Sequence, residues 1–166
     1  RQIWIQPITL EQDKLDYLQS HLMLLFTGFP RNASEVAAEQ IRRTPEKTKE
    51  LTRMMEMVEE AVAVLNGEQS DYTDFGKLLH ESWMVKRSLT ENISSPEIDE
   101  IYQIAREAGA LGGKLLGAGG GGFVLFFARP DIQSKIREKL NKLLYVPFNF
   151  HDLGSQIVYY APEQNY

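Results

Sequence analysis

The part of the sequence with the clearest chemical potential is a glycine-rich stretch in the second half of the chain. Seven of the twelve glycines fall in positions 112–122, which we expect to form a loop, and the apolar run Phe123-Val124-Leu125-Phe126-Phe127 predicts a buried strand directly after it. Successive glycine N–H groups can converge on an anion such as a phosphate. Lack of a Cβ also lets another backbone approach closely. Phosphate binding and close packing against a neighbouring domain are therefore equally favoured by the stretch itself.

The order of elements separates this stretch from two familiar phosphate loops. It has no Gly-x-x-x-x-Gly-Lys-[Ser/Thr] pattern, because Phe123 follows Gly122. The dinucleotide fingerprint needs a strand before the loop and a helix after it, whereas the elements predicted here come in the opposite order. The glycines alone are weak evidence for a bound phosphate.

A second group of candidate binding residues lies on a helix predicted from Asp71 to about Thr90. Four side chains recur there at helical spacing: His80, Trp83, Lys86 and Arg87. Two cations and an imidazole beside an indole would suit an anionic or sugar ligand. Spacing alone favours the simpler interpretation of a solvated basic face with one snorkelling lysine.

Patterns for metal binding or nucleophilic catalysis are missing from the sequence. There are no cysteines, and the three histidines, at positions 21, 80 and 151, lack the spacing of metal ligands. We expect His21 and His151 to lie in or beside strands as ordinary hydrogen-bonded residues. No serine has the glycine elbow of a hydrolase. The sequence therefore predicts no metal site and assigns no catalytic residue.

Composition and charge narrow the class of protein. With 166 residues, 43% of them hydrophobic, the chain suits one domain with a real core. Its net charge of −5 argues against nonspecific nucleic-acid binding. No apolar run is long enough to cross a membrane, and a cytoplasmic location is expected. Because the chain begins at Arg1 with a strand-like pattern and no Met, we interpret it as a fragment of a larger protein.

The glycine stretch must be positioned by alternating strands and helices. Strands are predicted at residues 1–8, 21–27, 123–127, 145–150 and 156–160, with a turn at 152–154. A turn or short helix is predicted over 10–20. Longer helices are predicted over 32–43, 45–67, 71–90, 96–109 and 130–144. This order predicts an α+β fold, a mainly antiparallel sheet with helices packed on one face, whose last third resembles half of a ferredoxin-like fold.

Local signals support several of these helices. Asn32 with Glu35 has the spacing of a capping box, and Thr44-Pro45 and Ser95-Pro96 each place a cap residue before a proline. Asp71 is a further cap candidate. The second long helix has an apolar stripe that predicts core packing: Leu51, Met54, Met55, Val58, Ala61, Val62 and Leu65.

Two stretches together resemble one family of enzymes. Residues 114–123, Lys-Leu-Leu-Gly-Ala-Gly-Gly-Gly-Gly-Phe, are similar to the third, C-terminal motif of the GHMP small-molecule kinases. Residues 79–89 and 93–99 are similar to the sugar-kinase branch of that family, typified by kinases of D-glycero-D-manno-heptose 7-phosphate. The resemblance covers residues 70–128 well and the remainder in order of elements.

The resemblance implies a two-domain enzyme that transfers the γ-phosphoryl group of ATP, with Mg²⁺, to a hydroxyl group of a small molecule. It favours heptose 7-phosphate as the acceptor, with fucokinase-like and mevalonate-type acceptors as competitors. Residues 1–166 would be the C-terminal domain, inactive alone. Its partner would be the N-terminal domain of the same kinase, which would carry the nucleotide loop, the catalytic Asp and most contacts to ATP and Mg²⁺. A noncatalytic module of this fold, binding a metabolite or a protein, is the alternative, and homodimerisation is open.

The same resemblance implies roles for individual residues. The glycines expected to pack against the phosphate loop and line the cleft are Gly117, Gly119, Gly120 and Gly121. Lys114 matches a basic position before them. The family's preceding helix borders the acceptor site, which strengthens the case for His80 and its neighbours. Trp83 would stack on a sugar ring, and Lys86 or Arg87 would anchor a substrate phosphate.

Overall fold

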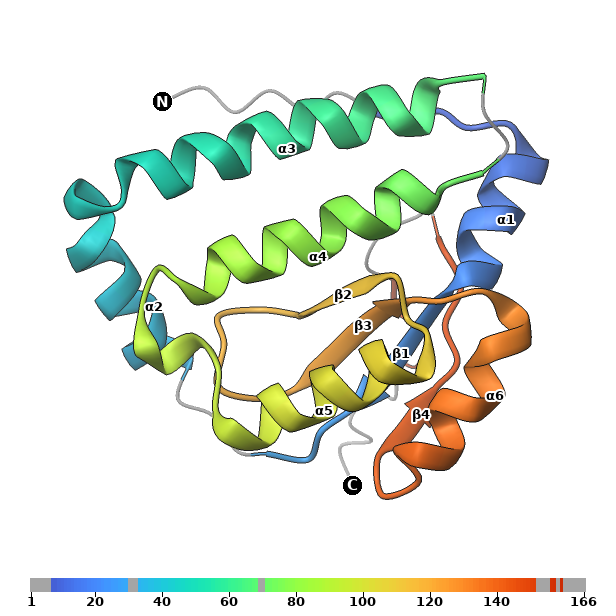
Figure 1. Ribbon diagram of the computed structural model, residues 1–166. Coiled ribbons are helices and arrows are strands. Elements are labelled where there is room, and N and C mark those ends of the chain that lie inside the picture. The colour runs from blue at the N-terminus through green and yellow to red at the C-terminus, as the bar shows by residue number, and fades with distance from the viewer. Residues whose placement is uncertain (1–6, 30–32, 69–70, 152–155, 158, 160–166) are drawn as a thin grey trace, which may run out of the picture.

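The computed structural model describes residues 7–29, 33–68, 71–151, 156–157 and 159. Its centre is a four-stranded antiparallel sheet in the order β2-β3-β1-β4 (Figure 1). The strands are β1 (Leu22–Phe26), β2 (Gly112–Leu115), β3 (Phe123–Phe127) and β4 (Leu144–Val146). β1 lies between β3 and β4, and β2 and β3 form a hairpin. This order with its intervening helices is ferredoxin-like, and the predicted α+β fold is confirmed.

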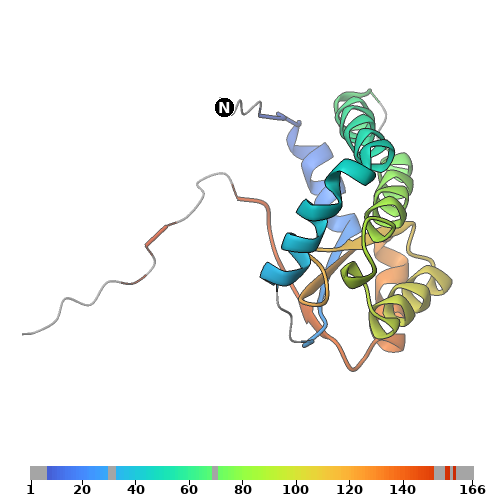
Figure 2. The ribbon, with the colours of Figure 1, turned by 90° about the vertical axis from the view of Figure 1, so that its left-hand side faces the viewer.

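The helices lie mainly on one face and one edge of this sheet. They are α1 (Gln12–His21), α2 (Ala33–Arg43), α3 (Thr48–Asn66), α4 (Thr73–Arg87), α5 (Pro96–Ala108) and α6 (Pro130–Lys139). In Figure 2, α5 and α6 lie together on one side of the strands. α4 runs along the outer edge of β2, and α3 packs on the far side of α4.

The core follows from the alternation of side chains along the strands. Met23 and Leu25 of β1 and Phe126 of β3 point toward α5 and α6 and are at most 1% exposed. Leu22 and Phe127 point to the opposite face, where they form a smaller cluster with residues of α1 and the chain before α4. The sheet is thus fully covered on one face and only partly on the other.

Backbone contact joins the sheet edge to α4. A Cβ atom on Gly112 would lie 1.9 Å from the carbonyl oxygen of Gly76 and 2.8 Å from the backbone nitrogen of His80. Glycine at position 112 therefore lets α4 rest against β2. The expectation of one continuous loop over 112–122 is wrong at its start, because Gly112–Leu115 form β2.

Several predicted helix boundaries also differ. The short helix that was one alternative for residues 10–20 is confirmed as α1, but it ends at His21, the first residue of the strand predicted over 21–27. Thr44–Glu46 form a 3₁₀ turn, so α3 begins only at Thr48, without a side-chain cap. The helix predicted to reach Thr90 ends at Arg87. Asn32, residues 1–6 and the predicted turn at 152–154 lie outside the described residues.

Two apolar side chains of the predicted stripe are exposed. Met55 and Val58 of α3 are 65% and 62% exposed, whereas Met57, outside the predicted stripe, is buried. Leu144, the last residue of the helix predicted over 130–144, instead begins β4 and is 63% exposed. Among the described elements α3 packs mainly on α4, so it buries a narrower stripe than a helix lying on a sheet.

Candidate functional site

The hairpin connection between β2 and β3 is the candidate site, and we call residues 116–122 the glycine loop. Its base is fixed to the end of β1 by Thr27, which is buried. The Thr27 N–H donates to the Gly122 carbonyl at 2.8 Å, and its hydroxyl donates to the same oxygen at 2.9 Å. The Gly122 N–H donates back to that hydroxyl at 3.1 Å. Leu116 N–H closes the hairpin on the Phe123 carbonyl at 2.8 Å.

The inner side of the glycine loop packs backbone to backbone on the 3₁₀ turn after α4 (Glu91–Ile93). The Gly120 N–H donates to the Ile93 carbonyl at 3.1 Å. Gly119 has a φ of +129°, and a Cβ there would lie 2.8 Å from the Cα of Ile93. Only glycine fits this conformation and this contact. Close backbone packing therefore explains the glycines on the inner side of the loop. The packing partner is Ile93 of the same domain, whereas the sequence had suggested a neighbouring domain.

The outer side of the glycine loop combines backbone donors with a cation. Gly117 is exposed, and its carbonyl accepts a hydrogen bond of 2.6 Å from the Lys86 ammonium. The Ala118 carbonyl accepts from the Gln40 amide at 2.8 Å. Among the described residues, the N–H groups of Gly117, Ala118 and Gly119 have no acceptor. Consecutive backbone donors beside an ammonium group suit an anion such as a phosphate.

Of the four residues predicted on the α4 face, the structure brings only Lys86 to the glycine loop. Arg87, next in sequence, forms an ion pair of 2.5 Å with Asp99 of α5 and lies 6.0 Å from the centre of the Trp83 ring. Asp99 also accepts from the Ser94 hydroxyl at 2.5 Å. Arg87 therefore ties the end of α4 to the start of α5.

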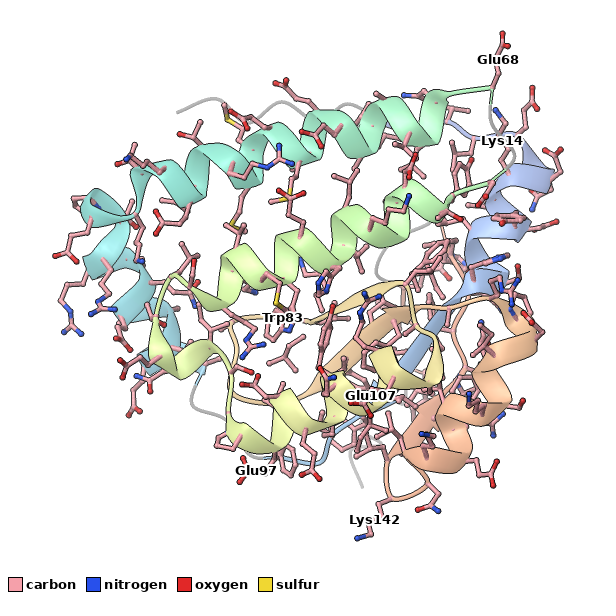
Figure 3. The ribbon with its side chains drawn as sticks, viewed as in Figure 1. Lys14, Glu68, Trp83, Glu97, Glu107 and Lys142 are labelled. Carbon is pink, nitrogen blue, oxygen red and sulfur yellow. The ribbon has the colours of Figure 1, made fainter. Side chains whose placement is uncertain are left out.

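Trp83 and His80 face α5 and the core. Trp83 is 0% exposed, on the inner side of α4 (Figure 3), so neither face of its ring is open to a sugar and it packs the core instead. A hydrogen bond of 2.8 Å joins the Nδ1 of His80 to the Tyr102 hydroxyl. Burial lowers the pKa of His80, and the nearby charge of Arg106 lowers it further. Burial raises the pKa of the Tyr102 hydroxyl to about 12.

Lys114 lies away from the outer side of the glycine loop. It sits on β2 beside Leu125, on the sheet face opposite α5 and α6. There it lines an apolar groove of about 250 Å³ between α3 and α4, together with Ile8 and Met57. Among the described residues, the side-chain ammonium of Lys114 has no hydrogen-bond or ion-pair partner.

Three residues of the site were not found by sequence reasoning: Thr27, Gln40 and Ile93. They come from the residue after β1, from α2 and from the turn after α4. Thr27 is the last residue of the strand predicted over 21–27, so the pairing of β1 with β3 would have placed it opposite Gly122. No sequence signal distinguishes Gln40 from other polar helix residues.

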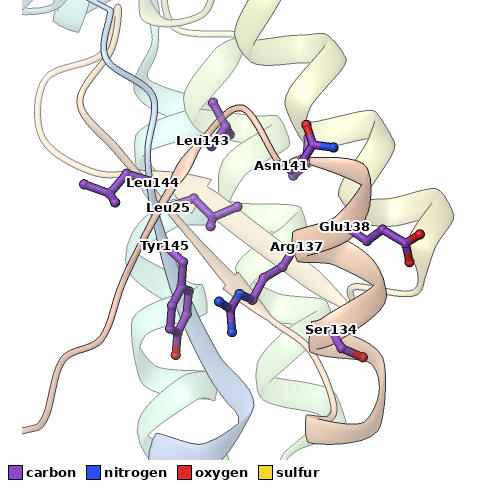
Figure 4. A pocket seen from close by; sticks show the side chains of 9 residues that line it. Leu25, Ser134, Arg137, Glu138, Asn141, Leu143, Leu144 and Tyr145 are labelled. Atoms are coloured by element: carbon purple, nitrogen blue, oxygen red, sulfur yellow. The ribbon is translucent and has the colours of Figure 1, made fainter.

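A larger cavity of about 520 Å³ lies between α6 and β4 (Figure 4). The Arg137 guanidinium reaches across it and lies 4.4 Å from the centre of the Tyr145 ring. None of the residues that line this cavity belongs to the glycine loop.

In the part of the chain that the structure describes, no group of three His, Cys, Asp or Glu side chains is arranged to hold a metal ion. The described helices include none with the length and apolarity needed to span a bilayer.

Comparison with known proteins identifies relatives of this domain. The family model described as "GHMP kinases C terminal" matches residues 37–146. Over 143 residues the chain is 26% identical to D-glycero-alpha-D-manno-heptose 7-phosphate kinase of Campylobacter jejuni, covering 86% of this chain and 42% of that protein. Over 132 residues it is 31% identical to mevalonate kinase of Thermococcus gammatolerans, covering 75% of this chain and 38% of that protein.

Solved structures share the fold. The chain superposes on mevalonate kinase of L. major in complex with R-mevalonate with a TM-score of 0.65 and 22% identity, covering 84% of this chain and 44% of that one. A putative sugar kinase from Campylobacter jejuni gives a TM-score of 0.57 at 24% identity, covering 91% of this chain and 42% of that one. The chain thus spans about two fifths of the length of the relatives it matches.

Proposed function

The chain belongs to the GHMP kinase family, as a C-terminal domain, and from this premise we propose that the full-length protein phosphorylates a sugar or sugar phosphate with ATP. The acceptor that we favour is D-glycero-D-manno-heptose 7-phosphate, because a kinase of that substrate matches 86% of the chain. We assign the catalytic Asp and most contacts to ATP and Mg²⁺ to the N-terminal domain, because the chain spans about two fifths of its relatives.

The observation that carries this proposal is the outer side of the glycine loop. Phosphoryl transfer depends mainly on positioning and on neutralising charge on the phosphoryl oxygens. The N–H groups of residues 117–119 and the Lys86 ammonium provide donors of the required kind. Thr27 and Ile93 hold the loop from behind, so these donors need little reorganisation when an anion arrives. ATP, when bound, would supply the transferred group.

Lys86 is the residue that we propose to contact a phosphate group. Its ammonium lies at the Gly117 carbonyl, where it could also reach an anion held by the loop. Arg87 has Asp99 as its partner and Trp83 is buried, so these two residues would shape the site through packing. His80 would also shape the site through packing, by its hydrogen bond to Tyr102. Lys114 lies on the sheet face opposite α5 and α6, so we do not place it at the phosphate.

A mevalonate-type acceptor is the second candidate. The Thermococcus relative is 31% identical, higher than the heptose kinase, although it covers less of the chain. The two acceptors differ in a way that the site can distinguish, because heptose 7-phosphate already carries a phosphate and mevalonate carries a carboxylate.

The test is ADP release by the full-length protein with Mg²⁺ and ATP, using heptose 7-phosphate, fucose, galactose and mevalonate in parallel. We expect kcat/KM for heptose 7-phosphate to exceed the others by about tenfold or more. Preference for mevalonate would favour the second candidate. Binding of a sugar phosphate without ADP release above background for any acceptor would identify a noncatalytic module and refute the kinase proposal.

A further inference from the structure

A pocket of about 430 Å³ lies between α5, the end of α6 and the residues that follow β1, and we call it the α5–α6 pocket. Five apolar side chains line it: Phe29, Ile101, Ile104, Leu140 and Leu143. Ile101 and Leu140 are 7% and 6% exposed, so the core holds this apolar lining in place. Small-molecule sites in proteins have volumes of about 300–1,000 Å³ and combine an apolar lining with a few polar groups. The α5–α6 pocket has this size and this lining.

The rim of the α5–α6 pocket carries opposite charges on its two sides. Glu97 and Glu100 are exposed on α5, and Lys139 and Lys142 are exposed at the end of α6 and in the turn after it (Figure 3 labels Glu97 and Lys142). Among the described residues, none of these four side chains forms an ion pair. The carboxylates and the ammonium groups thus do not neutralise one another by direct contact. A molecule that carries both an ammonium and a carboxylate group can bridge them.

One wall of the α5–α6 pocket is the segment that holds the glycine loop. Thr27 and Phe29 both line the pocket. The Thr27 hydroxyl is hydrogen-bonded to Gly122, and it accepts from the Phe29 N–H at 3.4 Å. A Cβ on Gly121 would lie 2.6 Å from the Phe29 carbonyl oxygen, so the two backbones are in contact. A molecule packed on Phe29 therefore contacts the residues on which the glycine loop rests.

We propose that the α5–α6 pocket binds an α-amino acid with a large apolar side chain, as an effector of the glycine loop. Its ammonium group would contact the rim glutamates, its carboxylate the rim lysines, and its side chain the apolar lining. Charge complementarity favours such a zwitterion over other small molecules. A fatty acid or a phosphate ester would meet two glutamates without a cation to offer them, and a simple amine would meet two lysines without an anion.

The effect on the glycine loop follows from the shared wall. An amino acid packed against Phe29 would restrict the segment 27–29 and, through Thr27, the base of the loop at Gly122. A ligand that orders the loop and an anion that binds the ordered loop favour each other's binding. The effect on ATP rests on the proposed kinase function, whereas binding in the pocket and ordering of the loop do not depend on it.

Binding is tested by ligand-detected NMR titrations of the full-length protein with L-phenylalanine. Two matched probes each lack one charge: 3-phenylpropionate has no ammonium group, and 2-phenylethylamine has no carboxylate. Each loses its contacts to one side of an exposed rim, so we expect each to bind about fivefold or more weakly than L-phenylalanine. Equal or tighter binding of either probe would refute recognition of a zwitterion. The absence of saturable binding of L-phenylalanine would refute the site.

Variants of the rim locate the bound amino acid. Two double variants should each weaken the binding of L-phenylalanine by about fivefold or more, E97Q/E100Q and K139Q/K142Q. The matched controls are Glu107→Gln and Lys135→Gln, which change exposed charges on the same two helices outside the pocket and should leave binding unchanged. A native circular dichroism spectrum is required of each variant. Equal effects of the rim and control variants would place the ligand elsewhere and refute the proposal.

The link to the glycine loop is measured by amide hydrogen exchange without ATP. Saturating L-phenylalanine should slow exchange at Gly120 and Gly122 further, by about threefold or more. Unchanged exchange at saturation would refute the effector role. Assays for ADP release on the same samples separate this inference from the proposed function. An active kinase that binds no L-phenylalanine would overturn the effector site alone. A protein that binds it and orders the loop, but phosphorylates none of the acceptors, would overturn the kinase proposal alone.

Discussion

Gly119→Ala in the full-length protein should distort the glycine loop and destabilise the domain. The native φ of +129° lies outside the left-handed region that side chains tolerate, a strain of about 1–3 kcal/mol. The new Cβ would also lie 2.8 Å from the Cα and 2.9 Å from the carbonyl oxygen of Ile93. Both are backbone atoms that cannot rotate away, and such overpacking costs about 1–3 kcal/mol.

With partial relaxation we expect a loss of about 3 kcal/mol, or a fall in Tm of about 6–12 °C. The control is Gly28→Ala, which has a positive φ of +73° but no atom within 4 Å of the added Cβ. That variant should lose only about 1–2 kcal/mol. Thermal unfolding followed by circular dichroism compares the two. If they lose equal stability, the contact with Ile93 does not constrain the loop and the reasoning is refuted. A kcat/KM that falls only in Gly119→Ala would link the distortion to the site.

Three further variants test individual contacts. Lys86→Ala should raise the KM for a phosphorylated acceptor by about tenfold, because it removes an ammonium from the site; an unchanged KM would exclude Lys86 from substrate binding. Burial lowers the pKa of His80 below its ordinary 6.5, so the unfolded chain binds a proton first and stability falls as the pH drops below that value. His80→Gln should flatten this dependence of Tm between pH 7 and 5. Gly112→Ala would place a Cβ 1.9 Å from the Gly76 carbonyl and should destabilise more than a typical overpacking of about 1–3 kcal/mol, measured by urea unfolding.

The elements with local signals were predictable. α5 begins at Pro96, and the Ser95 hydroxyl accepts from the Ile98 N–H at 3.3 Å, as the cap pattern predicts. It ends at Ala108, and the next residue, Gly109, has a φ of +118° and provides a left-handed C-cap. Such signals act between residues three or four apart, so they can be interpreted without the tertiary structure.

The elements that depend on contacts between distant residues were not predictable. Glycine is unfavourable in strands, so Gly112 and Gly113 hid β2 from prediction. Glycine is needed at these two positions because α4 and the Phe126 side chain approach the strand closely, which no local pattern indicates. Trp83 was placed on a basic face, yet α4 lies at the sheet edge between α3 and α5, so residues on its flank are buried as well.

The family motif located the glycine loop, but not the groups that hold it. Thr27 and Gln40 lie 95 and 78 residues from their partners in the loop. Gln40 looks like any polar residue of a helix. Lys86 was one of four cationic or aromatic candidates, and only the course of α4 past the loop separates it from Arg87.

The hydrogen bonds of the loop predict how it responds to a nucleotide. Gly120 and Gly122 donate to Ile93 and Thr27, whereas the N–H groups of residues 117–119 have no acceptor among the described residues. If docking of a second domain excludes water, each unpaired N–H costs about 1–3 kcal/mol, so the closed cleft must bring in an acceptor. A phosphate provides several.

Amide hydrogen exchange of the full-length protein should therefore divide the loop into two sets. Gly120 and Gly122 should be protected without a ligand, and residues 117–119 should gain protection only with ATP and Mg²⁺. Exchange in the 117–119 set that is unaffected by ATP, in a protein shown to bind it, would mean that these donors do not face the phosphates. The loop would then have only its packing role, because the inner contacts to Thr27 and Ile93 are sufficient to explain why glycine is needed at position 119.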